Sequence, residues 1–195
     1  MDLSERLIEE IRQEFPAFRL VDKRRHGMSR AIDRALKIVT IGGQRGYLTV
    51  YHTVIGDTLY VPASWESTSD VERAIVLRHE RVHLRQRRRY GTALMTFLYL
   101  VPFFPVGLAW GRARIEWEAY VETLRATAEL CGLGAARSPE LRARIVRRFT
   151  GPDYGWMWPF GRQVERWYDA ALQVIAAELE EPRAGTVLEQ GEHPA

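Results

Sequence analysis

Apolar residues recur three and four positions apart along several stretches of the chain, a spacing that places them on one side of an α-helix. In the first stretch Leu7, Ile8, Ile11 and Phe15 share a side, and Pro16 follows. Residues that favour helix starts and stops bound the other stretches. The predicted helices cover about residues 4–15, 70–90, 114–131, 139–149 and 162–181.

A different pattern lies between the first two helices. Residues 37–41, 47–54 and 58–61 are rich in β-branched and aromatic side chains, glycine-containing turns separate them, and Pro62 ends the last one. We therefore expect an α+β fold that is mainly helical, with a small three-stranded antiparallel sheet beside the helix of residues 70–90.

Composition bounds the class of protein. The chain has 195 residues, 46% of them hydrophobic, so it can bury the core of one domain, which we expect over residues 1–181 with a disordered tail over 182–195. The single Cys131 excludes an internal disulfide and a cysteine-rich zinc module. The acidic N-terminus lacks the pattern of a secretory signal, which favours a cytoplasmic protein. A net charge of +3 without a nucleic-acid-binding motif predicts no nucleic-acid partner.

The helix of residues 70–90 carries the candidate chemistry. It begins with a capping box of Ser69 and Glu72 and contains His79-Glu80-Arg81-Val82-His83, the pattern HExxH. Residues four apart lie on one side of a helix, so both imidazoles can reach one zinc ion (Zn2+) while Glu80 lies beside them as a base. Two ordinary core histidines are the alternative.

The longer zinc motif of the metzincins would need Gly at position 86 and His at position 89. The chain has Gln86 and Arg89 there, which excludes that class. A catalytic zinc keeps three protein ligands and one open position, so the third ligand must lie elsewhere in the chain.

Two glutamates of the helix 114–131 are candidates for that ligand. Glu116 shares its side of the helix with small or weakly polar residues, whereas Glu118 shares its side with charged residues. A buried carboxylate is costly unless a cation compensates it. We therefore favour Glu116, with Glu118 or a simple surface ion pair as the alternatives.

HExxH followed by Glu-x-x-Ala on a later helix resembles the gluzincin metallopeptidases, in particular the minigluzincins and the CAAX-type prenyl proteases. The resemblance covers about residues 47–131 and rests on these two motifs. In the family an Asp four residues after the glutamate supports a zinc-bound histidine; Tyr120 stands there instead, and its hydroxyl is the candidate replacement.

The resemblance also implies an edge strand beside the active-site helix that holds an extended peptide substrate. The matching segment is Thr58, Leu59, Tyr60 and Val61, with Val54 on the neighbouring strand as a further candidate contact. His52, on that neighbouring strand, is expected to be structural rather than a ligand.

The nineteen residues from 92 to 110 carry no charge and are mostly apolar. If they crossed a bilayer once, His79 and His83 would lie about 30 Å from Glu116, too far to share an ion. Pro102 and Pro105 favour a turn instead. We expect a buried hairpin; a shallow hairpin making peripheral membrane contact through residues 92–110 is the alternative.

Two further features have two interpretations each. Arg78, Arg81, Arg85 and Arg88 form a stripe on the side of the helix opposite the histidines. We expect this stripe to be solvated; contact with a partner or with anionic lipid is the alternative.

Tyr154 lies in an aromatic loop over residues 151–160. This loop either closes the core or lets the tyrosine donate a hydrogen bond to an oxyanion.

Together these features predict a zinc peptidase that cleaves a peptide or protein substrate, with Glu80 as general base. A non-catalytic metal-binding or scaffolding protein, or a module at the membrane surface, are the competing hypotheses.

Overall fold

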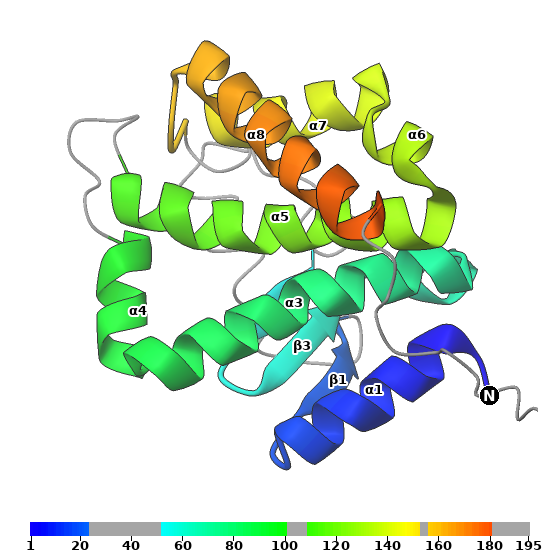
Figure 1. The fold of residues 1–195 in the computed structure, drawn as a ribbon. Coiled ribbons are helices and arrows are strands. Elements are labelled where there is room, and N and C mark those ends of the chain that lie inside the picture. Colours follow the sequence, from blue (N-terminus) through cyan, green and yellow to red (C-terminus); the bar gives the residue numbers. More distant parts are fainter. Residues whose placement is uncertain (24–51, 101–108, 153–155, 181–195) are drawn as a thin grey trace, which may run out of the picture.

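The fold is mainly helical, with one small sheet (Figure 1). The computed structural model describes residues 1–23, 52–100, 109–152 and 156–180. The helices of the described residues are α1 (Leu3–Glu14), α3 (Asp70–Tyr90), α4 (Thr92–Leu100), α5 (Trp110–Cys131), α6 (Leu133–Ala136), α7 (Pro139–Thr150) and α8 (Gly161–Glu180). The strands are β1 (Arg19–Asp22), β2 (Thr53–Ile55) and β3 (Thr58–Val61), and a 3₁₀ helix, η2, covers Ala63–Ser67.

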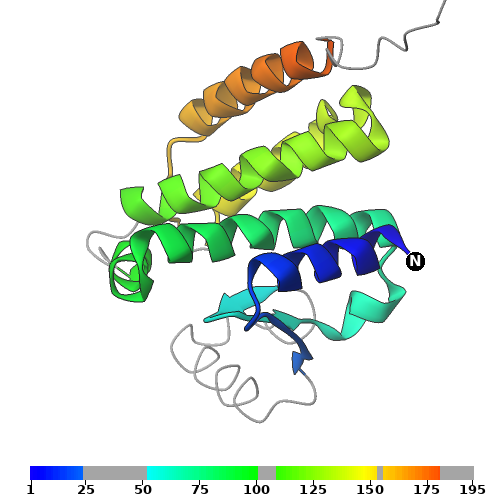
Figure 2. The same ribbon diagram turned by 60° about the horizontal axis from the view of Figure 1, so that its bottom comes forward.

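Helices α3 and α5 lie side by side in the middle of the molecule (Figures 1 and 2). Helix α1 and the sheet cover α3 on one side, and their apolar side chains form a cluster that includes Ile11, Leu59 and Leu77. Helices α6, α7 and α8 cover α5 on the other side, around a cluster that includes Phe149 and Tyr168. The boundary between α3 and α5 is therefore where two apolar clusters meet.

Helix α3 begins and ends where the sequence predicts. The Ser69 hydroxyl accepts a hydrogen bond from the Glu72 amide at 3.2 Å, and the Glu72 carboxylate accepts one from the Ser69 amide at 3.3 Å, which completes the capping box. The helix ends at Gly91, whose φ of 74° is costly for any residue with a side chain. The predicted helices 139–149 and 162–181 are confirmed as α7 and α8 with small shifts.

The predicted three-stranded antiparallel sheet is wrong. Strand β3 lies in the centre, with β2 antiparallel on one side and β1 parallel on the other. The sequence analysis did not identify β1 because four residues after Pro16 are too few to show an alternating pattern. The predicted strand 37–41, most of 47–54 and the tail 182–195 lie outside the described residues.

The central place of β3 corrects a second expectation. Thr58, Leu59, Tyr60 and Val61 are bonded to strands on both sides, so they offer no free edge to a substrate. Of the strands that the structure describes, β2, which contains Val54, is an outer one.

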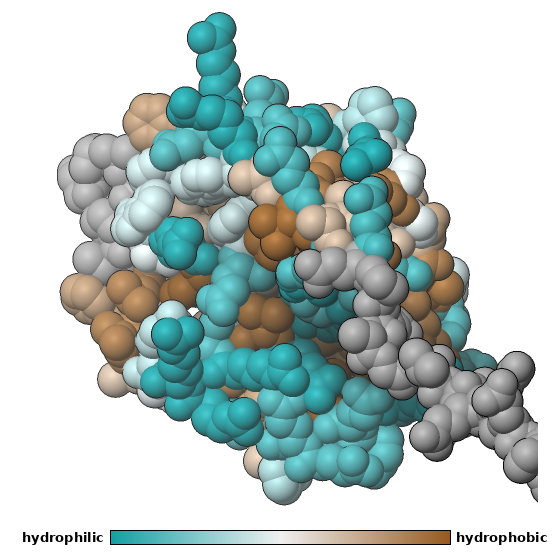
Figure 3. All heavy atoms as spheres, viewed as in Figure 1, coloured by the Kyte–Doolittle hydropathy of each residue, from teal (hydrophilic) through white to brown (hydrophobic). Residues whose placement is uncertain are grey.

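Helix α4 turns the chain back, so that α5 runs beside α3 (Figure 1). The expectation that its apolar residues are buried is wrong for Leu94 and Phe97, whose exposed fractions are 47% and 58%. Figure 3 shows hydrophobic side chains gathered at this end of the molecule. Among the described residues, none of the helices has the length and apolar character needed to cross a membrane.

The arginine stripe pairs with neighbouring helices, and two of its members, Arg85 and Arg88, are also exposed to solvent as expected. Arg78 pairs with Glu122 and Glu129 of α5. Three arginines converge on Glu14 of α1, namely Arg81, Arg85 and Arg88. Arg81 also pairs with Glu10, so the four arginines of the stripe face four carboxylates, and each arginine has a partner within the chain.

Candidate metal centre

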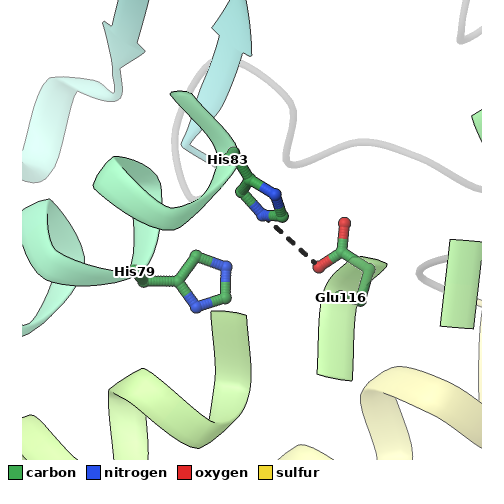
Figure 4. A group of neighbouring side chains, drawn as sticks. All are labelled: His79, His83 and Glu116. Carbon is green, nitrogen blue, oxygen red and sulfur yellow. Dashed lines mark ion pairs between the residues drawn. The ribbon is translucent and has the colours of Figure 1, made fainter. Parts of the chain in front are cut away.

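Three side chains from α3 and α5 converge at the boundary between the two helices (Figure 4). His79, His83 and Glu116 each offer one ligand atom, and these atoms all lie within 4.8 Å of one another. The Nε2 atom of His83 is 3.9 Å from an Oε2 atom of Glu116. His79 and His83 precede Glu116 by 37 and 33 residues, and they meet it because α4 reverses the chain direction.

The two candidate glutamates differ in how far they are buried. Glu116 is 1% exposed and faces the histidines, as expected from its small neighbours on the helix. Glu118 is exposed and accepts a hydrogen bond from the side chain of Gln86 at 2.9 Å. Of these two carboxylates, Glu116 is the one placed to share a cation with both imidazoles.

The hydrogen bonds of His79 determine which of its nitrogens carries the proton. Its Nδ1 atom lies 2.9 Å from the Thr123 hydroxyl, and that hydroxyl donates its only hydrogen to the Ala119 carbonyl at 3.3 Å. The hydroxyl must therefore accept from the Nδ1–H group. This leaves the Nε2 lone pair free for a metal ion.

The same reasoning applies to His83. Its Nδ1 atom lies 2.9 Å from Oε1 of Gln86, and an amide oxygen can only accept a hydrogen bond. The Nδ1–H group donates, so in the neutral ring the lone pair lies on Nε2. Both histidines thus present the tautomer that binds zinc through Nε2.

Electrostatics also favour neutral imidazole at His79. Burial lowers the pKa of His79 well below 6.5, and the neighbouring His83 and His52 lower it further, while a hydrogen bond to the Ala119 carbonyl acts in the opposite direction. A ring that stays neutral keeps its ligand nitrogen unprotonated.

Glu80 lies one residue after His79, with an exposed fraction of 8%. The pKa of Glu80 is raised to about 7, chiefly by burial and also by the Glu116 carboxylate, while His83 and Lys23 act in the opposite direction. A carboxylate whose pKa lies near neutrality can both take and return a proton, as a general base must.

The donor set fits zinc. Two imidazole nitrogens and one carboxylate are a common set of protein ligands for a catalytic zinc, and both nitrogens carry free lone pairs. Ligand atoms around a tetrahedral zinc lie about 3.3 Å apart, so the three side chains need to close by no more than about 1.5 Å.

Several residues expected at the site have other roles or lie elsewhere. Tyr120 touches the His79 ring edge-on, with ring centroids 5.0 Å apart, and the hydroxyl that accepts from His79 Nδ1 belongs to Thr123. Tyr154 lies outside the described residues. Its loop neighbours Met157 and Trp158 pack against the α5–α8 cluster, which is the core-closing role.

Sequence reasoning missed Thr123, Gln86 and Lys23. Helical spacing was a usable signal for the first two: Thr123 follows Glu116 by seven residues, or two turns, and Gln86 follows His83 by three residues, or about one turn. Lys23, fully buried at the end of β1, has an electrostatic influence on both Glu80 and His52. No sequence pattern marks it.

Surface hollows lie away from these histidines. One is lined by Val82, Arg85, Arg114 and Glu118, among others, on the opposite side of α3. Its lining holds three arginines and two glutamates but no histidine, so the hollow lacks the donor set of the metal centre.

Comparisons with family models, with curated proteins and with solved structures found no match to this chain. The interpretation of the site therefore depends on its own geometry and chemistry.

Proposed function

We propose that this protein is a zinc-dependent peptidase of the gluzincin type. His79, His83 and Glu116 would hold the ion, and Glu80 would act as general base. The observation that supports this most directly is the meeting of three suitable ligand atoms within 4.8 Å, with a buried carboxylate next to them in sequence.

Zinc held by His79, His83 and Glu116 would supply Lewis-acid activation of a water molecule and of the peptide carbonyl. Glu80 would take a proton from that water as it attacks the carbonyl carbon, and would then pass the proton to the leaving nitrogen. The peptide C–N bond breaks, and one water is consumed. Burial of Glu80 keeps bulk water from competing for the proton.

The substrate would be an extended peptide. Since β3 is central, the strand proposed to pair with the peptide is β2, through the backbone around Val54. His52 directly precedes β2 and influences the pKa of His79, which supports a position of this strand beside the metal ligands.

The variant Glu80→Gln tests the chemistry. It keeps the size of the side chain and removes the base, so we expect unchanged zinc content and a loss of at least about a hundredfold in the cleavage of an unfolded protein substrate. Glu129→Gln is the matched control, because it removes a carboxylate that pairs with Arg78 on the far side of α3. Full cleavage by Glu80→Gln would remove Glu80 from the mechanism.

Zinc binding without turnover is the competing function. It is favoured by the neutral Thr123 hydroxyl at His79, where a carboxylate would make the imidazole a stronger ligand. A wild-type protein that binds one zinc and cleaves no unfolded protein or peptide library would support this second function.

Contact with an anionic membrane is a separate proposal. Leu94 and Phe97 of α4 and Trp110 at the start of α5 are all about half exposed, and Arg114 lies over the Trp110 ring at 5.9 Å. Aromatic and basic side chains together suit the interface of a bilayer. Co-sedimentation with vesicles containing anionic lipid, lost in the variant Phe97→Ser, is the expected result; a wild-type protein that stays in the supernatant at low salt would contradict it. A cytoplasmic location remains a prediction.

A further inference from the structure

We infer that Gln86, anchored by Glu118, is a positioning residue that holds His83 and the Glu116 segment at the spacing needed for metal binding. This inference rests on the proposed metal centre and adds two residues to it. Gln86 lies on α3 one turn after His83, and Glu118 lies on α5 two residues after Glu116.

Gln86 makes three hydrogen bonds, one within α3 and two to α5. Its Oε1 atom lies 2.9 Å from Nδ1 of His83. Its Nε2 atom donates to the backbone carbonyl of Ile115 at 3.0 Å and to Oε2 of Glu118 at 2.9 Å. One side chain thus contacts a proposed ligand on α3 and the residue before a proposed ligand on α5.

The chemistry of these partners fixes the orientation of the amide. A carbonyl and an ionised carboxylate can only accept, so both must face the NH₂ group. The amide oxygen is then left for the only remaining partner, the His83 Nδ1–H group. Gln86, His83 and Ile115 are all buried, so water does not replace the hydrogen bonds that Gln86 makes with these two residues.

Glu118 strengthens the arrangement with its charge. A hydrogen bond from an amide to a carboxylate is stronger than one between neutral groups, and it makes the amide oxygen a better acceptor. The His83 ring then becomes a better donor of its Nε2 lone pair. Glu118, the alternative ligand of the sequence analysis, is thereby assigned an indirect role through Gln86.

A double-mutant cycle tests this inference through the dissociation constant for zinc, measured by competition with a chromogenic chelator. We expect Gln86→Leu to weaken zinc binding about 10- to 100-fold. Glu118→Ala should weaken it about 3- to 10-fold, because water partly replaces this exposed carboxylate. If Glu118 acts through Gln86, the double variant should lose no more than Gln86→Leu alone.

The tautomer of His83 in the metal-free protein gives a readout that a general loss of stability would not produce. Nitrogen-15 NMR should show protonated Nδ1 in the wild type and in the control Glu122→Ala, whose carboxylate contacts Arg78 and Arg125 instead. In Gln86→Leu it should show a mixture of tautomers. If Gln86→Leu does not fold, the same measurements on Glu118→Ala, which changes an exposed residue, still test the inference.

The outcomes separate this inference from the proposed function. A wild-type protein that binds no zinc would overturn both. If the wild-type protein binds zinc, two results would overturn only the positioning role of Gln86. One is an unchanged zinc affinity in the single variants; the other is losses of zinc affinity that add in the double variant.

Discussion

The two sides of helix α3 hold polar residues in opposite ways. On the side of the metal centre, the Nδ1 atoms of His79 and His83 each donate to a side-chain oxygen, that of Thr123 or of Gln86, and the other hydrogen bonds of these two partners are assigned. On the other side, three arginines converge on the carboxylate of Glu14, and one of them, Arg81, also pairs with Glu10.

This difference follows from burial. A buried polar group that loses its partner has no water to replace it, so the arrangement on the metal side depends on each contact. On the arginine side the Arg85 and Arg88 side chains are 52% and 61% exposed, and water and salt can substitute for the carboxylate. Changes of similar size should therefore have large effects on the metal side and small ones on the arginine side.

The largest effect is expected from the proposed third ligand. Glu116→Ala should weaken zinc binding by on the order of 3 kcal/mol, a hundredfold or more, because structural zinc binding of about 10–16 kcal/mol is shared by a few ligands. Glu118→Ala should cost tenfold at most. The zinc content and the zinc affinity of the two purified variants are compared, by metal analysis and by zinc titration. Equal losses in both variants would contradict the assignment of Glu116.

A smaller effect is expected from the hydroxyl that orients His79. Thr123→Val keeps the shape of the side chain but removes the acceptor for the Nδ1–H group, so zinc affinity should fall about tenfold. Thr127→Val is the matched control, since that hydroxyl lies one turn further along and donates only to the Thr123 carbonyl at 2.8 Å. If both variants bind zinc equally well, Thr123 does not orient the ligand.

The same contrast explains what the sequence could predict. HExxH and the burial of Glu116 follow from local helical geometry, because the residues concerned lie on single helices with clear start and stop signals. The strand β1, the central place of β3 and the pairing of the arginines with α1 depend on contacts between distant segments. Periodicity within one element carries no information on which element lies opposite, so these features were missed or misassigned.

The smallest effect is expected on the arginine side, and it depends on pH. The hydrogen bond from Arg85, with that from Arg81, lowers the pKa of Glu14 to about 2, against an opposing effect of burial. Because the folded-state pKa is below the unfolded value of 4.5, this stabilisation is fully present above about pH 4.5 and is lost as the pH falls toward 2.

Urea unfolding of the metal-free wild type and of Glu14→Gln should accordingly differ by about 1 kcal/mol at pH 6 and by much less at pH 2.5, since partly exposed ion pairs contribute little each. Glu9→Gln, which removes a carboxylate paired with exposed Arg12 at 3.8 Å, is the control and should change neither value. Zinc affinity at pH 7 should be the same in all three proteins, because Glu14 contacts only the far side of α3. A loss of zinc binding in Glu14→Gln would mean that the two sides of the helix are coupled, and the contrast between them would then fail.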